Sequence, residues 1–162
     1  IARMIDCARA KGKPILIDPK GSNYDRYRGA TVITPNRSEL AQVVGSWESE
    51  EELTEKAQAL REKLNLTAVL LTRSEEGMTL FSDKGAKTIP AQALEVYDVS
   101  GAGDTVIAVM ATMMAMGKPL EDAMRIANRA GGIVVGKLGT ATVSFEELFP
   151  NGYDDLFAGE AL

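Results

Sequence analysis

The sequence contains no histidine and only one cysteine, Cys7, among its 162 residues. Without histidine, the chain cannot build a Ser-His-Asp triad, a histidine proton shuttle or an ordinary zinc site. One cysteine cannot form an intramolecular disulfide, which favours a reducing, cytoplasmic setting. Any chemistry must therefore come from carboxylates, lysines, hydroxyl groups and backbone amides.

Long apolar runs and an excess of positive charge are also missing. The longest charge-free run, residues 105–117, is well short of the roughly 20 apolar residues that cross a membrane, so it predicts a buried helix. A net charge of -5 disfavours a nucleic-acid surface, because such surfaces collect Lys and Arg against phosphates. We expect neither a membrane nor a nucleic acid as partner, and any bound phosphate must be held locally.

Short apolar runs that end in proline predict buried strands at residues 14–19 (PILIDP) and 30–35 (ATVITP). A third buried strand is predicted by AVLLT at residues 68–72. The segments GMTLFS and KTIPAQ, joined by DKGA, predict a hairpin of more exposed strands.

Helical patterns alternate with these strands. Residues 49–65 predict an amphipathic helix that begins with Ser49 and Glu52 as a capping box. Residues 103–116 predict a second helix, and a third restarts at Pro119, with Ala and Gly allowing the two to pack closely. The order of elements predicts an α/β sandwich with a mostly parallel sheet. The opening IARMIDCARAKGKP is typical of a helix already under way, so we expect a piece of a longer chain.

The segment VSGAGDT, residues 99–105, is the first candidate for chemistry. Gly101 and Gly103 allow a tight turn whose N–H groups converge at a helix start, where the helix dipole favours an anion. Asp104 has no cation nearby in the sequence and could accept a proton from a hydroxyl group. The alternative is an ordinary turn in which Asp104 only complements the helix dipole.

The segment TPNRSE places Asn36 and Glu39 three residues apart, directly after a predicted strand. The two side chains could form the cap of a helix. They could instead hold water molecules around Mg²⁺, which keeps several waters and uses few protein ligands. Both interpretations stay open on spacing alone.

Two further loops leave the carboxyl ends of predicted strands, where open α/β sheets bind ligands. TRSEEG, residues 72–77, could be a ligand loop or a hydroxyl-rich turn into the hairpin. In DPKG, Lys20 could reach a phosphate or be a solvated lysine. Neither a GxxxxGK[ST] loop nor a strand followed by GxGxxG is present, which excludes those two modes of nucleotide binding.

In this order, PNRSE, TRSEEG and DVSGAGDT resemble the carboxyl half of the ribokinase-like (PfkB) sugar kinase family. Within the family, ILIDPKG, RYRGATVITPN, EVYDVSGAGDTV and AGGIVVGKLGTATVS are most similar to bifunctional bacterial enzymes whose kinase domain acts on heptose 7-phosphate. The resemblance implies a ribokinase-like three-layer sandwich with a mostly parallel sheet, represented by its carboxyl-terminal half. It assigns residues 1–147 to the kinase domain and leaves 148–162 as a terminal tail or the start of a linker.

The resemblance also implies an activity, the transfer of the γ-phosphate of ATP to a hydroxyl of a sugar phosphate. The implied product is heptose 1,7-bisphosphate, a precursor for the lipopolysaccharide core. By the matching motif, Asp104 is the catalytic base, and the amides of Gly101, Ala102 and Gly103 form the anion hole. Asn36 and Glu39 are implied to organise Mg²⁺ and the phosphates through water. Thr72, Ser74 and Gly77 match the nucleotide loop, and Asn128 matches a position near adenine. Asp98 and Ser100 match residues that bind a monovalent cation such as K⁺. Lys20 stays open between a phosphate contact and a solvated lysine.

Two parts of such enzymes are not matched, namely the amino-terminal half with the sugar-binding loops and the adenylyltransferase domain. Ribose, fructose or a nucleoside therefore stays open as acceptor, and so does a nucleotide-binding or assembly module without turnover. A half-domain would expose strand edges and apolar surface, so we expect association of the fragment. For the full-length protein we expect a homodimer.

Overall fold

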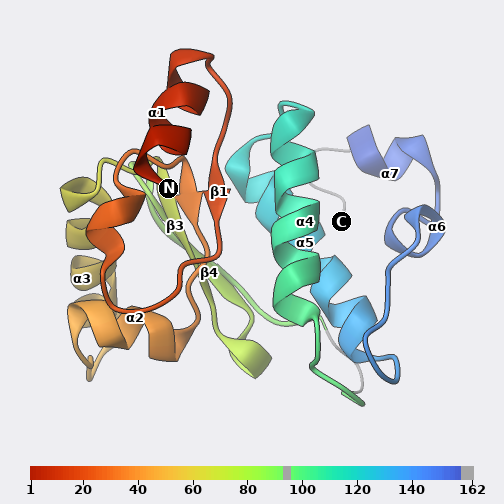
Figure 1. Cartoon of the computed structure of the whole chain (residues 1–162). Coiled ribbons are helices and arrows are strands. Elements are labelled where there is room, and N and C mark those ends of the chain that lie inside the picture. Colours follow the sequence, from red (N-terminus) through yellow and green to blue (C-terminus); the bar gives the residue numbers. More distant parts are fainter. Residues whose placement is uncertain (93–95, 158–162) are drawn as a thin grey trace. The chain divides into compact units, whose positions relative to one another are not determined.

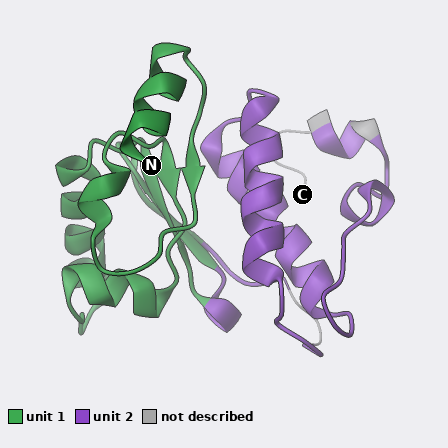
Figure 2. Ribbon diagram, in the orientation of Figure 1, with its two compact units in different colours: residues 1–73, 78–88 green, residues 74–77, 89–162 purple. Residues whose placement is uncertain are grey.

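The computed structural model describes residues 1–92 and 96–157, and the chain divides into two compact units (Figure 1, Figure 2). Unit 1 comprises Ile1–Arg73 and Met78–Thr88, and unit 2 comprises Ser74–Gly77 and Ile89–Leu162. The chain therefore passes from one unit to the other three times.

Unit 1 is built on a five-stranded sheet with the order β1-β2-β3-β4-β5. The parallel part confirms the three predicted strands, although β1 and β2 are shorter than predicted and β1 is only half-buried. In the parallel register, Leu16 of the first strand lies beside Val32 of the second, and Val32 lies beside Ala68 of the third. The strands are β1 (Leu16–Ile17), β2 (Val32–Ile33), β3 (Ala68–Thr72), β4 (Met78–Ser82), which is antiparallel to β3, and β5 (Gly85–Ile89).

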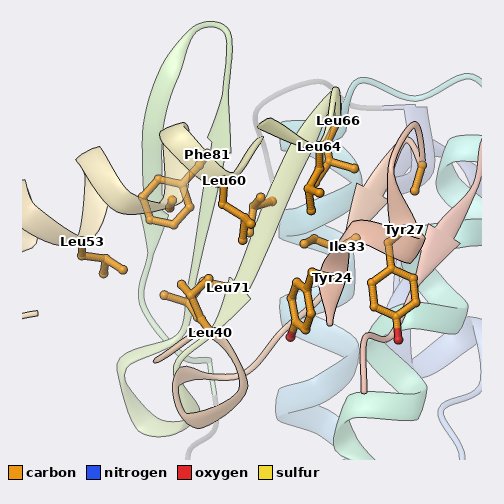
Figure 3. Packing of buried hydrophobic residues seen from close by; sticks show 13 residues of the cluster. Tyr24, Tyr27, Ile33, Leu40, Leu53, Leu60, Leu64, Leu66, Leu71 and Phe81 are labelled. Atoms are coloured by element: carbon orange, nitrogen blue, oxygen red, sulfur yellow. The ribbon is translucent and has the colours of Figure 1, made fainter. Parts of the chain in front are cut away.

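The core of unit 1 is formed by this sheet together with the short 3₁₀ helix η1 (Tyr24–Tyr27), α2 (Arg37–Val44) and α3 (Glu50–Lys63) (Figure 3). Helix α1 (Ala2–Ala10) buries Ile5. Helix α3 follows the predicted three- and four-residue spacing, which brings its leucines onto the core side. Each fully buried leucine or phenylalanine contributes roughly 1.5–3 kcal/mol. The cluster contains Ile33, Leu40, Leu53, Leu60, Leu64, Val69, Leu71 and Phe81.

Two details of unit 1 correct the sequence-based expectations. Strand β4 was expected to be exposed, but Met78–Phe81 are all buried and only β5 is largely exposed. The reason is that β4 pairs with β3 inside the sheet, while β5 occupies its edge. The capping box of α3 is also only half formed. The Ser49 side chain accepts from the N–H of Glu52, whereas the Glu52 carboxylate accepts from Glu48 N instead of Ser49 N.

Unit 2 is helical in its described residues. It contains the 3₁₀ turn η2 (Ser74–Glu76) and helices α4 (Ala102–Ala115), α5 (Leu120–Val135), α6 (Phe145–Leu148) and α7 (Tyr153–Phe157). The predicted close packing of α4 and α5 is confirmed, because a Cβ at Gly131 would lie only 3.2 Å from Val106 Cγ2. Pro119 is the residue before α5 rather than its first residue.

Helix α4 is less buried than its uncharged sequence predicted. Val106, Met110 and Met113 are buried, but Ala108 and Thr112 are exposed. Helix α4 therefore buries one face and exposes small uncharged residues on the other, instead of being buried all round. None of the helices in the described part of the chain has the length and apolar character that a membrane crossing demands.

Candidate functional site

The carboxyl ends of the three parallel strands of unit 1 carry polar side chains. Asp18 follows β1, Asn36 follows β2, and Thr72 is the last residue of β3. Asn36 and Thr72 form a parallel β-bridge, and Thr72 N donates to Pro35 O at 3.0 Å. Because parallel strands end at the same edge of a sheet, these three residues of unit 1, one from each predicted loop, lie at one edge.

Asn36 and Glu39 form a complete capping box at the start of α2. Asn36 Oδ1 accepts from Glu39 N at 2.9 Å, and Glu39 Oε2 accepts from Asn36 N at 2.9 Å. The Ser38 hydroxyl also donates to Asn36 Oδ1 at 2.8 Å. The capping interpretation of this pair is therefore correct. Because Asn36 Oδ1 already accepts two hydrogen bonds, further acceptor capacity at this cap lies on the Glu39 carboxylate.

Lys20 lies between two carboxylates. Its Nζ is 2.7 Å from Glu39 Oε1 and 3.1 Å from Asp18 Oδ1, although its side chain is 64% exposed. The hydrogen bond from Glu39 first, and then that from Asp18, raises the pKa of Lys20 above its usual value of 10.5. Lys20 is thus a charged group held at the strand ends rather than a freely solvated lysine.

The side chains at this edge can accommodate a hydrated divalent cation. Each Glu39 oxygen accepts one hydrogen bond from the protein, which leaves lone pairs that can accept from water. No group of three or more Cys, Asp or Glu side chains suited to a metal occurs among the described residues. Direct coordination by a protein cage is therefore not supported here, whereas contact through water fits the residues present.

Tyr24 is a buried polar residue near this edge that the sequence did not reveal. It belongs to the core cluster, and its hydroxyl is the one buried side-chain polar atom without a hydrogen-bond partner among the described residues. Burial is the main reason that the pKa of Tyr24 is raised, and the charge of Glu39 adds to the effect. Tyr24 therefore stays neutral beside the carboxylates.

The predicted nucleotide loop has a strained backbone. Ser74 has a positive φ of 52°, which non-glycine residues rarely adopt, and Gly77 has a φ of 90°. A Cβ at Gly77 would lie 2.1 Å from Ile89 O, so only glycine fits. The Gly77 N–H donates to Ser74 O at 3.1 Å and closes the turn. The glycine of this motif therefore has a structural role, whatever the loop binds.

Asn128, predicted to lie near adenine, is buried in α5. Its Nδ2 donates to Pro90 O at 2.8 Å. The side chain thus holds the segment after β5 against α5, and this contact gives Asn128 a structural function.

In unit 2, the segment VSGAGDT forms the start of α4. Gly101 is the N-cap residue in the left-handed region, with φ 79° and ψ 0°, as predicted for a tight turn. Asp104 lies in the first turn and is exposed. Within residues 1–92 and 96–157, no acceptor is bonded to the N–H groups of Gly103 and Asp104, and no side chain pairs with the Asp104 carboxylate. Such unpaired donors at a helix start suit an anion.

One predicted amide is less available than the others. Ala102 N donates to Val99 O at 3.3 Å, a long bond that belongs to the turn before the helix. Gly103, in contrast, has a helical backbone, and a Cβ there would meet no atom within 4 Å. Among the described residues of this turn, the N–H groups of Gly103 and Asp104 are therefore the ones open to an acceptor.

Asp98 and Ser100, the predicted cation residues, form a compact turn before α4. Asp98 Oδ1 accepts from Ser100 N at 2.9 Å. This bond first, then the Ser100 hydroxyl, and a smaller contribution from the Gly139 N–H lower the pKa of Asp98 below 3.8. The carboxylate is therefore ionised at neutral pH and closes the turn before α4.

An apolar groove of about 520 Å³ also lies within unit 2, along α4 and α6. Its walls offer methyl groups and thioethers rather than charged groups, so they do not suit a phosphate. The lining includes Ala108, Thr112, Met116, Val143, Phe145 and Leu148.

Comparison with known proteins identifies the family. The model of the "pfkB family carbohydrate kinase" matches residues 1–147. The chain belongs to the pfkB family of carbohydrate kinases. It is 58% identical over 148 residues to a D-beta-D-heptose 7-phosphate kinase of Bordetella bronchiseptica, covering 91% of this chain and 47% of that protein. It is 56% identical over 149 residues to the bifunctional protein HldE of Proteus mirabilis, covering 91% of this chain and 31% of that protein.

Solved structures agree with this assignment of the PfkB fold. A ribokinase of Arabidopsis thaliana, solved with ribose and ATP, is 26% identical with a TM-score of 0.76, covering 85% of this chain and 46% of the ribokinase. Phosphofructokinase-2 of Escherichia coli, solved with potassium, is 19% identical with a TM-score of 0.82, covering 96% of this chain and 51% of that enzyme. The predicted ribokinase-like fold is confirmed. The chain spans less than half the length of the two curated relatives.

Proposed function

We propose that the protein containing this chain is an ATP-dependent kinase of D-glycero-β-D-manno-heptose 7-phosphate. It would phosphorylate O1 of this sugar and yield the 1,7-bisphosphate used to make ADP-heptose for the lipopolysaccharide core. The observation that carries the proposal is the 58% identity to a heptose 7-phosphate kinase over 148 residues, a stretch that includes the start of α4 with Asp104.

Asp104 would act as the general base of the reaction. Its exposed carboxylate accepts the proton of the sugar hydroxyl while that oxygen attacks the γ-phosphorus of ATP. The bond between the γ-phosphorus and the bridging oxygen then breaks, and ADP leaves with the electron pair. The N–H groups around Gly101, Ala102 and Gly103 would stabilise the negative charge on the transferred phosphoryl group.

The strand ends of unit 1 would contribute to binding of the nucleotide. Asn36 and Glu39 would hold the waters of Mg²⁺, which supplies charge neutralisation to the phosphates when bound. Lys20 would add a positive charge for a phosphate. The residues proposed for the nucleotide itself are Thr72, Ser74, Gly77 and Asn128, and those proposed for a monovalent cation such as K⁺ are Asp98 and Ser100.

The proposal also covers the organisation of the chain. Residues 1–147 would form the carboxyl half of the kinase domain, and 148–162 would be a tail or the start of a linker. Exposed apolar side chains such as Met4, Val99 and Leu138 support the expectation that the chain associates with further protein surface, including a second copy. We propose a homodimer for the full-length protein in the cytoplasm.

The test is an acceptor panel with the full gene product that contains this chain. The protein is incubated with ATP and Mg²⁺ and with heptose 7-phosphate, ribose, fructose, fructose 6-phosphate or adenosine, and products are identified by ³¹P NMR. The proposal predicts a new anomeric phosphate signal with heptose 7-phosphate and far slower turnover of the others. Faster turnover of another acceptor would assign a different kinase activity to the chain. ATP binding without transfer to any acceptor would favour a nucleotide-binding module.

A further inference from the structure

Arg73 is a buried cation that the sequence-based site does not include. Its side chain is 7% exposed, and it lies between Thr72 and Ser74 in the proposed nucleotide loop. Both terminal nitrogens of Arg73 bind one carboxylate, with Nη1 2.8 Å from Glu50 Oε2 and Nη2 2.6 Å from Glu50 Oε1. This two-point contact, the Arg73–Glu50 fork, fixes the plane of the guanidinium group as well as its position.

The partner carboxylate lies on a rigid element. Glu50 is the first residue of α3, and leucines of that helix are buried in the core of unit 1. The hydrogen bond from Arg73 is the main reason that the pKa of Glu50 is lowered, so the pair is ionised. The fork therefore joins the end of β3 to the start of a well-anchored helix.

A chain of hydrogen bonds continues from Arg73 through the sheet. Arg73 Nη1 also donates to Thr79 Oγ1 at 3.2 Å, and Thr79 Oγ1 lies 2.9 Å from Thr88 Oγ1. All three residues belong to unit 1 and lie close to points where the chain crosses between the units. Arg73 directly precedes the segment Ser74–Gly77 of unit 2, and Thr79 follows that segment by two residues. Thr88 directly precedes Ile89, where the chain enters unit 2 again.

The short segment between the first two passages is the loop Ser74–Gly77. Its far end is held because Gly77 packs directly against the backbone of residues 89–91. Its near end begins with the positive φ of Ser74, a conformation that persists only where neighbouring contacts impose it. The Arg73 fork, one residue earlier, is a contact of that kind.

We infer that Arg73, held by Glu50, is a positioning residue that sets the conformation of the loop at residues 72–77 for nucleotide binding. This inference rests on the proposed function, since it assigns the loop to the nucleotide. Arg73 acts through the backbone of Thr72 and Ser74, and its guanidinium group, already engaged by Glu50 and Thr79, does not itself bind the phosphates. Loss of the fork should therefore weaken nucleotide binding more than it slows phosphoryl transfer.

The experiment uses the full gene product with the variants Glu50→Gln and Arg73→Lys. Glu50→Gln keeps the shape of the side chain and removes its charge, whereas Arg73→Lys keeps the charge and removes the fork. Glu51→Gln is the matched control, because Glu51 is an exposed neighbour in the same first turn of α3. For each protein, the Kd for ATP is measured by titration, KM for ATP and kcat are measured with saturating sugar, and Tm is recorded.

Both test variants should raise the Kd and KM for ATP about fivefold or more, with kcat within about twofold, while Glu51→Gln matches the wild type. The double variant should have a Kd for ATP no higher than that of the more strongly affected single variant, because each substitution removes the same contact. The inference is overturned if Tm falls in the test variants while KM and Kd stay unchanged, since the pair would then serve stability alone. Failure of the wild-type protein to bind ATP would instead overturn the proposed function, and with it the assignment of this loop.

Discussion

The two units present their predicted site residues in opposite ways. In unit 1, Lys20, Asn36 and Glu39 are bonded to one another through an ion pair and a complete capping box. In unit 2, Asp104 is exposed, and within the described residues the N–H groups of Gly103 and Asp104 have no acceptor. The charged groups of unit 1 are thus paired with their neighbours, whereas unit 2 has N–H donors and a carboxylate that are open to a ligand.

This difference predicts how each unit responds to amino-acid substitutions. Groups that bond to each other hold their geometry without a ligand, so substitutions at these groups in unit 1 should affect both the stability of the protein and its binding of ligands. Unpaired donors at a helix start contribute little to the stability of unit 2, so changes there can separate stability from activity. Substitutions in the two units can therefore show whether stability and activity are lost together or separately.

The largest loss of stability is expected for Gly77→Ala. A methyl group there would overlap Ile89 O, and the φ of 90° already disfavours alanine, so we expect a loss of about 3 kcal/mol or more. Gly21→Ala is the control, because Gly21 has a φ of 75° but no atom within 4 Å of the added Cβ, which predicts a loss of about 1–2 kcal/mol. Urea denaturation measures both, and equal losses would contradict the close approach at Gly77.

The next effect is a contrast between the two glycines of VSGAGDT. Gly101→Ala should cost about 1–2 kcal/mol, because alanine is strained at φ 79° and its Cβ would lie 3.2 Å from Thr140. Gly103→Ala should gain about 0.5–1 kcal/mol, since its backbone is helical and the space is open. If Gly103 faces the transferred phosphate, however, the more stable variant should lose phosphoryl transfer. Full activity in Gly103→Ala would contradict the anion hole at this position.

A smaller effect on stability is expected at the cap of α2. Asn36→Ala and Ser49→Ala each remove the side-chain cap of a helix in unit 1, and each should cost about 1 kcal/mol in urea denaturation. Only Asn36→Ala should also raise the Mg²⁺ concentration needed for half-maximal activity, by about tenfold. An equal Mg²⁺ requirement in the two variants would limit Asn36 to capping.

The smallest effect is the titration of Asp98. Because hydrogen bonds to the carboxylate lower its pKa below 3.8, its contribution to stability is present above the unfolded pKa and is lost as the pH falls through the folded pKa. NMR titration should place the midpoint of Asp98 below 3.8, and Ser100→Ala should raise it in part, since the Ser100 N–H remains. A wild-type midpoint at or above 3.8 would contradict the turn geometry.

Much of this architecture could be predicted from local patterns. Helix α3 begins and ends within about two residues of its prediction, and β3 matches AVLLT, because apolar spacing and capping residues act over short distances. The burial of β4 could not be predicted, since it depends on the position of that strand between β3 and β5. The uncharged sequence of α4 likewise gave no sign that Ala108 and Thr112 would be exposed.

The contacts within the site were harder to predict than its residues. The spacing of Asn36 and Glu39 indicated their capping bonds, but the contact of Lys20 with Glu39 depends on the alignment of β1 and β2 in the sheet. The fork between Arg73 and Glu50 joins residues 23 positions apart, and no local pattern marks it. The sequence shows an arginine inside TRSEEG, but its burial is a property of the folded chain.

The variant Asp104→Asn tests most directly whether Asp104 removes the proton from the sugar hydroxyl. In the full gene product with heptose 7-phosphate, kcat should fall by about 10²–10⁴-fold while the Kd for ATP stays within about twofold of the wild type. Asp154→Asn, a change of an exposed acid in the first turn of α7, is the control for loss of charge at a helix start and should retain kcat. A kcat for Asp104→Asn within about tenfold of the wild type would contradict this role and leave Asp104 as a partner of the helix dipole only.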